Sequence, residues 1–487
     1  METYFTPFRE NTIGVHQEFE SPYGPKKLIY ADWIASGRLY GPIEDAIRQQ
    51  FGPMVANTHT ETTHSGTLMT KAYHEARHII KEHVNAGPDD VLITAGFGMT
   101  GAVNKLQRIL GFKGCSAIKG SNCLQDSERP LVLITHMEHH SNQTSWYETI
   151  ADVLIVEHGA DGRPSPENLR KTLIANSHRK LKIGSFTACS NVTGIQTDIH
   201  AMAKVMHEFG GLCFADYAAS APYVDINMHP EDPLEALDAI FFSPHKFLGG
   251  PGSSGVLIFN KAMYKNQAPD HPGGGTVDWT NAWGEYKYID DIEAREDGGT
   301  PGFLQAIRTA LAIRLKEKMG TEQIAKREHD LVNRLFDGLE KIEGLLILEK
   351  HIRNRIGAVS VFFFKIHYNL VVKLLNDRFG IQTRGGCSCA GTYGHILFGI
   401  NKDESHRITN KIESGDLSEK PGFVRISIHP TMTNQEVDYI VEALNQIDKN
   451  HAEWALDYDY NPKTNEFYHK SGISNTLQGI VKEWFKL

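Results

Sequence analysis

The sequence has few cysteines, no long hydrophobic run and no excess of basic residues. Six cysteines scattered through 487 residues do not form the framework of a disulfide-stabilised secreted domain. No apolar run approaches the roughly 20 residues of a membrane helix, and the first residues lack the basic and apolar regions of a signal peptide. The formal charge of −9 argues against a nucleic-acid-binding protein. We therefore expect a cytoplasmic protein with neither a membrane nor a nucleic acid as partner.

Short apolar segments alternate with polar segments of helix length through the first part of the chain. Strands spaced in this way favour a parallel sheet that is covered by helices on both faces. We therefore predict an α/β fold. The strands are expected at residues 91–94, 131–135, 153–156, 181–186, 212–215 and 256–259.

The chain changes character after Pro301, and its length favours two domains. The later segments are typical of a smaller α+β domain: an amphipathic stretch at 303–345, an apolar run at 358–364, a helix near 370–379, a strand at 422–428 and a helix at 434–447. We expect four parts: an N-terminal arm (1–30), a large domain (31–295), a small domain (296–450) with an exposed insertion at 401–421, and a C-terminal tail (451–487).

A single lysine, Lys246, stands between an apolar strand and a glycine-rich turn. Ser243 and His245 flank it, and a second apolar run follows the turn. Burial lowers the pKa of an amine at such a place, and the neutral amine can form a Schiff base with a carbonyl carbon. The sequence therefore predicts that Lys246 is catalytic.

Two other strand ends carry groups that suit a phosphorylated, planar ligand. In open parallel sheets, ligands bind at the carboxyl ends of strands, where helix N-termini hold phosphate. Gly98, Met99 and Thr100 form such a turn and helix start. Asp216 directly follows a strand, where its carboxylate can keep a pyridinium nitrogen protonated. The alternative for Asp216 is a capping role only.

A third strand end carries the histidines His136, His139 and His140. An imidazole at this place can stack on a heteroaromatic ring and exchange protons near it. The alternatives are a polar loop or a metal site built from the three histidines. Because no cysteine or carboxylate cluster complements them, we predict no metal.

These motifs together resemble the class V aminotransferase and cysteine desulfurase family, from about Ile29 to Leu444. Each segment alone is weak, but their order and spacing are specific. The resemblance implies a fold-type-I transferase fold that depends on pyridoxal phosphate. The matching segments are residues 31–36, 57–59, 98–100, 138–142, 190–194, 243–246, 274–276 and 299–301.

The resemblance implies how these residues would hold pyridoxal 5′-phosphate. Lys246 would carry the cofactor, Asp216 would contact the ring nitrogen, and His139 would stack on the ring and shuttle a proton. Asn191 would lie near the ring hydroxyl. Thr276 would reach the phosphate of the partner subunit in a homodimer with shared active sites. The phosphate would be held by Gly98, Met99, Thr100, Ser243 and His245.

Two positions depart from the family pattern. Ala219 stands where the family usually has a glutamine that bonds the ring oxygen, so this hydrogen bond is missing or comes from another group. Met99 replaces the first threonine of the phosphate turn, where its backbone N–H alone would serve. Both departures concern cofactor contacts, and neither removes Lys246.

The type of reaction depends on the small domain. Residues 383–391 resemble the cysteine-bearing loop of group II cysteine desulfurases, which places Cys389 as the nucleophile. Arg425, with Arg384, would bind the substrate carboxylate, because a guanidinium matches a carboxylate geometrically. Metal binding, a redox pair and inert thiols are the alternatives for Cys387 and Cys389.

The resemblance implies conversion of L-cysteine to L-alanine, with a persulfide on Cys389 and a sulfur-acceptor protein as partner. Asn57 and His59 would lie near the substrate. The second hypothesis is a class V aminotransferase, epimerase or lyase that acts on another amino acid. The 36 positions between Cys389 and Arg425 favour this hypothesis, since the insertion within them is unlike the compared relatives. A third hypothesis, an inactive scaffold, conflicts with the intact Lys246 and Asp216.

Overall fold

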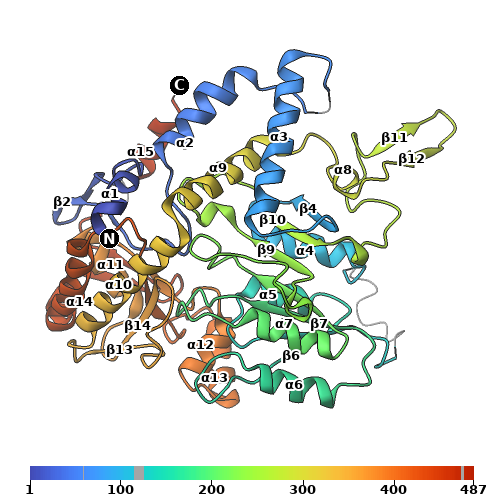
Figure 1. Cartoon of the computed structure of the whole chain (residues 1–487). Helices are drawn as coiled ribbons and strands as arrows, with labels where there is room; N and C mark the ends of the chain where they lie inside the picture. The colour runs from blue at the N-terminus through green and yellow to red at the C-terminus, as the bar shows by residue number, and fades with distance from the viewer. Residues whose placement is uncertain (59, 114–124, 473–476, 487) are drawn as a thin grey trace.

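The computed structural model shows a large sheet-based domain beside a smaller domain (Figure 1). It describes residues 1–58, 60–113, 125–472 and 477–486. Helix α9 (Phe303–Met319) packs along α3 (His64–His83) of the large domain and leads into the small one.

The large domain is built on a seven-stranded sheet. Strand β10 is antiparallel to both of its neighbours, and the other adjacent pairs are parallel. All residues of β5, β7 and β9 are buried, as in a sheet that is covered on both faces. The order is β4 (Asp90–Thr94), β10 (Val256–Asn260), β9 (Ala239–Phe242), β8 (Leu212–Asp216), β7 (Lys182–Thr187), β5 (Leu131–Ile134) and β6 (Asp152–Ile155). The predicted α/β fold is confirmed.

Alternate side chains of the strands pack on opposite faces of this sheet. Leu131 and Leu133 join one core, with side chains of α3, α6 (Pro166–Ala175), α7 (Ile199–Glu208) and α9. Val132 and Ile134 join the other core, with side chains of α4 (Met99–Ile109) and α5 (His140–Tyr147). The carboxyl ends of the parallel strands thus open onto the starts of α4 and α5.

The small domain has a four-stranded antiparallel sheet, and its helices share one core with it. The amphipathic stretch expected at 303–345 is divided by Gly320, whose φ of 76° ends α9 and starts α10. The strands are β13 (Leu345–Ile347), β14 (Ala358–Phe363), β17 (Phe423–Ser427) and β16 (Arg384–Gly386). The helices are α10 (Thr321–Leu339), α11 (Tyr368–Phe379) and α14 (Asn434–Trp454).

The N-terminal segment packs on the small domain. Phe5 and Phe8 of α1 (Glu2–Glu10) belong to its core, and Arg9 forms an ion pair of 2.6 Å with Glu436. Strand β3 (Ile29–Tyr30) pairs in parallel with β15 (Ile381–Gln382). The hairpin β1 (Glu18–Ser21) to β2 (Gly24–Lys27) precedes β3, and α2 (Gly41–Ala46) follows it. Residues 31–36 are thereby held where the two domains meet.

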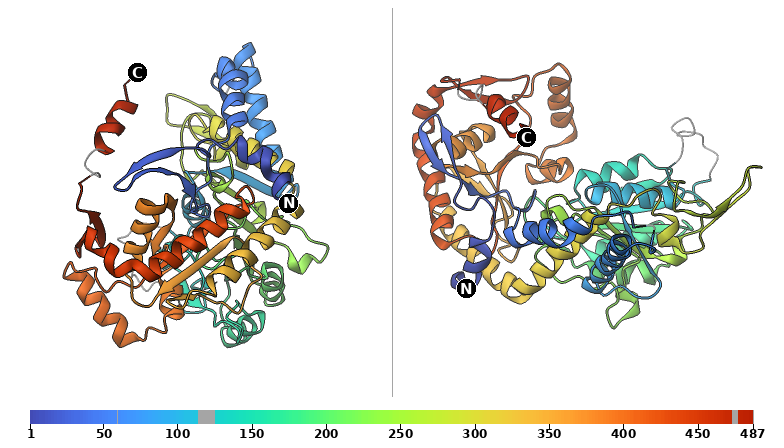
Figure 2. Two further views of the ribbon diagram at one scale, coloured as in Figure 1. Left: turned by 90° about the vertical axis from the view of Figure 1, so that its left-hand side faces the viewer. Right: turned by 90° about the horizontal axis from the view of Figure 1, so that it is seen from above.

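Three peripheral segments complete the chain. The insertion forms α13 (Lys402–Glu413) after α12 (Gly391–Leu397), and Ile408 is the buried residue of α13. A hairpin, β11 (Val277–Thr280) to β12 (Tyr286–Tyr288), projects from the large domain before α8 (Ile292–Arg295). Beyond α14, which continues past residue 450, β18 (Tyr458–Asn461) pairs with β19 (Glu466–His469), and α15 (Leu477–Trp484) lies apart from the body (Figure 2). Among the described residues, no helix is long and apolar enough to cross a membrane.

Candidate active site

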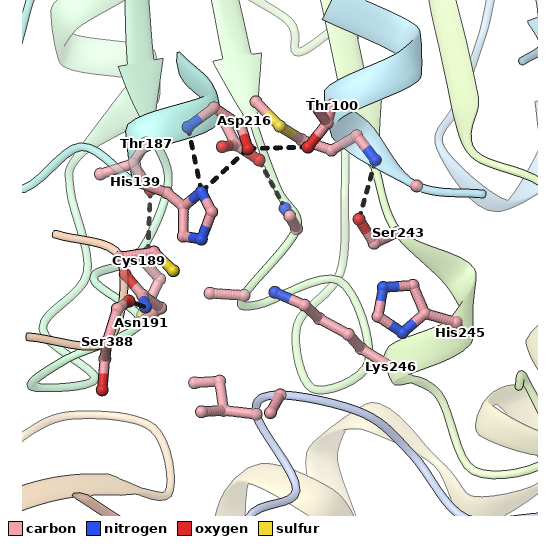
Figure 3. Close-up of a pocket in the computed structure, with 18 of the residues that line it drawn as sticks. Thr100, His139, Thr187, Cys189, Asn191, Asp216, Ser243, His245, Lys246 and Ser388 are labelled. Carbon is pink, nitrogen blue, oxygen red and sulfur yellow. Dashed lines mark hydrogen bonds between the residues drawn. The ribbon is translucent and has the colours of Figure 1, made fainter. Parts of the chain in front are cut away.

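A cavity of about 510 Å³ lies where the strand ends of the large domain face the small domain. Its lining comes from three parts of the chain: the sheet, the segment after β3, and the strands and loop at residues 384–425. The predicted residues that line it are Gly98, Met99, Thr100, His139, Asn191, Asp216, Ser243, His245, Lys246, Arg384, Cys389 and Arg425. Most of these residues are drawn in the close-up (Figure 3).

Lys246 follows β9 in a tight turn and extends into the cavity (Figure 3). Its backbone N–H donates to the Ser243 oxygen at 3.0 Å, and Gly250 N–H donates to the Phe247 oxygen at 3.0 Å. A Cβ on Gly250 would lie 1.9 Å from the Pro244 oxygen, so this turn requires glycine there. Desolvation lowers the pKa of the Lys246 amine to about 8, against the opposing effect of Asp216. A neutral, nucleophilic amine is therefore accessible near physiological pH.

Asp216 ends β8, and only 2% of its surface is exposed. Burial raises its pKa to about 6, although a 2.8 Å hydrogen bond from Ala218 N–H and the charge of Lys246 both lower it. Above pH 6 the site therefore holds a buried carboxylate. The bond from Ala218 is a local capping contact, so Asp216 combines a turn-capping role with a position on the cavity.

The start of α4 forms a cradle of hydrogen-bonding groups. Met99 N–H donates to the Ser243 hydroxyl at 2.9 Å, and the Thr100 and Ser141 hydroxyls are 2.7 Å apart. A Cβ on Gly98 would lie 2.9 Å from the hydroxyl oxygen of Ser243, so a side chain at this position would crowd the cradle. N–H groups and hydroxyls gathered at a helix start suit a phosphate group. The donor set fits the phosphate of the expected cofactor.

His139 caps the start of α5 and lines the cavity. Its Nδ1 accepts a 3.1 Å hydrogen bond from Ser141 N–H. Burial, assisted by the positive charge of Lys246, lowers the His139 pKa to about 3. The ring is therefore neutral at physiological pH, with its proton on Nε2. A neutral ring suits stacking on a planar heterocycle.

The neighbouring histidines form other contacts. His140 Nε2 accepts the Gly391 N–H at 2.9 Å, and His136 Nε2 lies 3.1 Å from the Gly162 oxygen. No group of three potential metal ligands occurs among the residues that the structure describes. His140 instead connects α5 to the loop after Cys389.

Sequence reasoning missed a buried carboxylate, Glu138, beside His139. One of its oxygens accepts the N–H groups of Thr135 (3.1 Å) and Thr187 (2.8 Å), and the other accepts Asn142 Nδ2 at 2.8 Å. Glu138 thereby joins the ends of β5 and β7. The only signal in the sequence was a charged residue three positions after the predicted strand at 131–135, next to a candidate ligand.

Asn191 connects the two domains at the floor of the cavity. Its Nδ2 donates to the Ser388 oxygen at 2.7 Å, while its buried Oδ1 has no partner. Ala219, which replaces the usual glutamine, also lines the cavity and presents only a methyl group. The free acceptor on Asn191 suits a hydroxyl donor on the expected ring. The thiol of Cys189, another residue not singled out from the sequence, lies on the same wall.

The loop around Cys389 is conformationally strained, and Cys389 is exposed between two buried residues, Ser388 and Ala390. Ser388 and Cys389 have φ angles of 49° and 59°, a region that side-chain-bearing residues rarely adopt. The Cys389 oxygen accepts the His140 N–H at 2.7 Å, and Ala390 N–H donates to the Cys387 oxygen at 3.0 Å. Both cysteines are free thiols, and Cys389 is the exposed one. The loop backbone is anchored while the thiol of Cys389 is accessible from solvent.

Arg384 and Arg425 are paired neighbours on β16 and β17. Asp32 lies between them: its Oδ1 is 2.6 Å from Arg425 Nη2, and its Oδ2 is 3.1 Å from Arg384 Nε. Arg425 Nη1 also donates to the Asn191 oxygen at 3.1 Å. Sequence reasoning noted the segment that contains Asp32 but not this contact, since residues 352 and 393 positions apart form it.

Two of the predicted residues, Asn57 and Thr276, are not among those that line the cavity. Asn57 precedes α3, outside the lining. Thr276 is fully buried at the base of the β11–β12 hairpin, where its hydroxyl donates to the Gly273 oxygen at 2.7 Å. His59 lies outside the described residues. Their roles stay predictions.

Two curated proteins that are similar in sequence carry the same name. A "probable cysteine desulfurase" of Halalkalibacterium halodurans is 29% identical over 371 residues, which cover 74% of this chain and 84% of that protein. One from Staphylococcus epidermidis is 26% identical over 432 residues, covering 88% and 94%. The curated relatives are thus matched over most of their length.

Solved structures show the same fold. The apo cysteine desulfurase of Thermococcus onnurineus superposes with a TM-score of 0.71 at 23% identity, covering 91% of this chain and 97% of that one. The cysteine desulfurase CsdA of Escherichia coli gives 0.68 at 21% identity, covering 91% and 98%. The family model "Aminotransferase class-V" matches residues 29–440. The chain therefore belongs to the class-V aminotransferase family and is a pyridoxal-phosphate-dependent enzyme.

Proposed function

We propose that this enzyme is a cysteine desulfurase, which converts L-cysteine to L-alanine and retains the sulfur as a persulfide on Cys389. One observation carries the proposal: an accessible thiol and two guanidinium groups line the same cavity as Lys246. The similarity to proteins named as cysteine desulfurases supports it.

The residues of the large domain suit the binding of pyridoxal phosphate at Lys246. The cofactor, when bound, stabilises negative charge on the substrate carbon that carries the amino group. Asp216 would hold a proton on the ring nitrogen, and the start of α4 with Ser243 would hold the phosphate. The Lys246 amine would remove the α-proton, because its lowered pKa leaves a neutral fraction at physiological pH.

The small domain supplies the groups for sulfur transfer. Arg425 and Arg384 would bind the substrate carboxylate. The Cys389 thiolate would attack the substrate sulfur, so that an S–S bond forms as the C–S bond breaks. The substrate carbon keeps the electron pair of that bond and is protonated, which yields alanine. The overall change is cysteine plus enzyme thiol to alanine plus enzyme persulfide, and no external oxidant is required.

We also propose a cytoplasmic homodimer with shared active sites and a protein that accepts the sulfur. The arrangement around Thr276 supports the shared site, because the β11–β12 hairpin that begins beside it projects away from the body of its own chain. Light scattering tests the assembly, and a mass close to one chain would contradict it.

The test of the proposed function is incubation of the purified enzyme with L-cysteine and a thiol reductant. We expect alanine and sulfide in equal amounts. The second hypothesis, an aminotransferase, predicts instead that a keto acid is required and that it receives the amino group. Cysteine consumption that yields pyruvate, or none at all, would contradict the proposal.

A further inference from the structure

The carboxylate of Asp32 lies between the two arginines, 2.6 Å from Arg425 and 3.1 Å from Arg384. We infer that Asp32 determines substrate specificity: it limits the arginine pair to substrates that carry one carboxylate. The inference rests on the proposed function in one respect, that the substrate is an amino acid whose carboxylate meets these arginines.

Asp32 is held in this place by its backbone. Ala31 N–H donates to the Gln382 oxygen at 2.9 Å, and Ser427 N–H donates to the Ala31 oxygen at 2.7 Å. Ile34 N–H donates to the Ser427 hydroxyl at 3.2 Å. These bonds fix the chain on both sides of Asp32, between β15 and β17. The carboxylate therefore stays beside the arginines when a ligand enters.

The arginines retain donors for a ligand. A guanidinium carries five N–H donors. The bonds from Arg425 to Asp32 and to the Asn191 oxygen use two of them, and the bond from Arg384 to Asp32 uses one. Both side chains line the cavity, and Arg384 is 49% exposed. An incoming carboxylate can therefore bind without displacing Asp32.

The balance of charge decides which ligand fits. Two guanidinium groups and one carboxylate leave a formal surplus of one positive charge, which a single carboxylate neutralises. Tyr30, which interacts with the same groups, adds no charge at physiological pH because burial raises its pKa to about 12. A second carboxylate on the ligand would find no uncompensated cation here and would be repelled by Asp32.

The test measures the binding of L-alanine and L-aspartate, which differ by one carboxylate, to the cofactor-loaded enzyme by titration calorimetry. The wild type is expected to bind alanine more tightly. Asp32→Asn raises the surplus of positive charge at the arginine pair to two. We expect this variant to favour aspartate over alanine by about tenfold or more relative to the wild type, as measured by the ratio of the two dissociation constants. The matched control is Asp45→Asn, which removes the charge of an exposed aspartate paired with Arg48. This control is expected to leave the ratio unchanged.

Arg384→Gln provides an independent arm, since Arg384 is half exposed and its loss should not prevent folding. The single variant Arg384→Gln removes the surplus positive charge and should weaken the binding of both amino acids. Combined with Asp32→Asn it restores a surplus of one, and the wild-type ratio should return. The inference is overturned if Asp32→Asn shifts the ratio by less than about twofold, or if the double variant keeps the ratio of Asp32→Asn.

The outcomes separate this inference from the proposed function. If cysteine yields alanine but the binding ratio does not respond to Asp32, the enzyme is a desulfurase and the inference fails. If the ratio responds but cysteine is not converted, the arginine pair works as inferred and the proposed reaction is wrong.

Discussion

The cofactor side and the reaction side of the cavity are built in opposite ways. On the cofactor side, Asp216 ends β8 and Lys246 follows β9, two strands of the large sheet. On the reaction side, Cys389 sits exposed in a strained loop of the small domain. A rigid sheet is suited to chemistry that a whole family shares, whereas a loop can change without loss of the fold. We therefore expect substitutions on the two sides to differ in their effects on stability and on activity.

The largest effect is expected for Lys246→Ala. Loss of the amine that binds the cofactor and removes the proton should lower turnover of cysteine by about a thousandfold or more. Borohydride reduction followed by peptide mass spectrometry should find the cofactor on Lys246 of the wild type. Lys261→Ala, which truncates an exposed lysine paired with Asp89, is the control. Full cofactor trapping in Lys246→Ala would refute the attachment site.

Glu138→Ala should show that the cofactor side is part of the structural core. The substitution removes the acceptor of three buried donors, the Thr135 N–H, the Thr135 hydroxyl and the Thr187 N–H, while Asn142 keeps its bond to the Ser185 oxygen. We expect the free energy of unfolding to fall by about 3 kcal/mol or more, measured by urea denaturation. Glu128→Ala, which truncates an exposed carboxylate, should change it by less than about 0.5 kcal/mol. Equal effects of the two substitutions would contradict the role of Glu138 in the structural core.

The cofactor side was largely predictable from the sequence. Lys246, Asp216 and Gly98 lie within four residues of the end of an apolar strand, and parallel strands bring their carboxyl ends to one edge of a sheet. The predicted sheet is confirmed for the same reason. The division of the 303–345 stretch at Gly320 was not predicted, because a single glycine separates the two helices.

The reaction side was less predictable, because its contacts join distant parts of the chain. The contact of Asp32 with Arg384 and Arg425 depends on the pairing of β3 with β15, and no local sequence pattern predicts this pairing. The left-handed backbone at Ser388 and Cys389 also follows from tertiary contacts, since neither residue type favours it. Resemblance to a family identified the residues here, but not the geometry that holds them.

The pH dependence of cofactor loading tests the environment of Lys246. The amine is protonated below a pKa of about 8, and only its neutral form attacks the cofactor. The initial rate at which the apoenzyme binds pyridoxal phosphate should thus rise about tenfold from pH 6 to pH 7 and level off above pH 8. Absorbance of the bound cofactor reports the rate. A rate that continues to rise toward pH 10 would show that burial does not lower this pKa.

The smallest effect is expected for Ser388→Gly on the reaction side. Glycine adopts a φ of 49° without strain, so the substitution should raise the free energy of unfolding by about 1 kcal/mol. Ser414→Gly makes the same change at a φ of −75°, where glycine should instead cost up to about 1 kcal/mol. Urea denaturation distinguishes the signs. A destabilised Ser388→Gly variant would mean that the loop is not strained.

The most direct test of the proposed function is the cysteine assay on Cys389→Ala, with Cys387→Ala as the matched control from the same loop. Because Cys389 is exposed, its truncation should leave the fold and cofactor binding intact. We expect Cys389→Ala to bind the cofactor as the wild type does, yet to release almost no alanine from L-cysteine. Cys387→Ala should retain most of the activity. If Cys389→Ala converts cysteine at the wild-type rate, the persulfide assignment is wrong and the reaction is not decided by this loop.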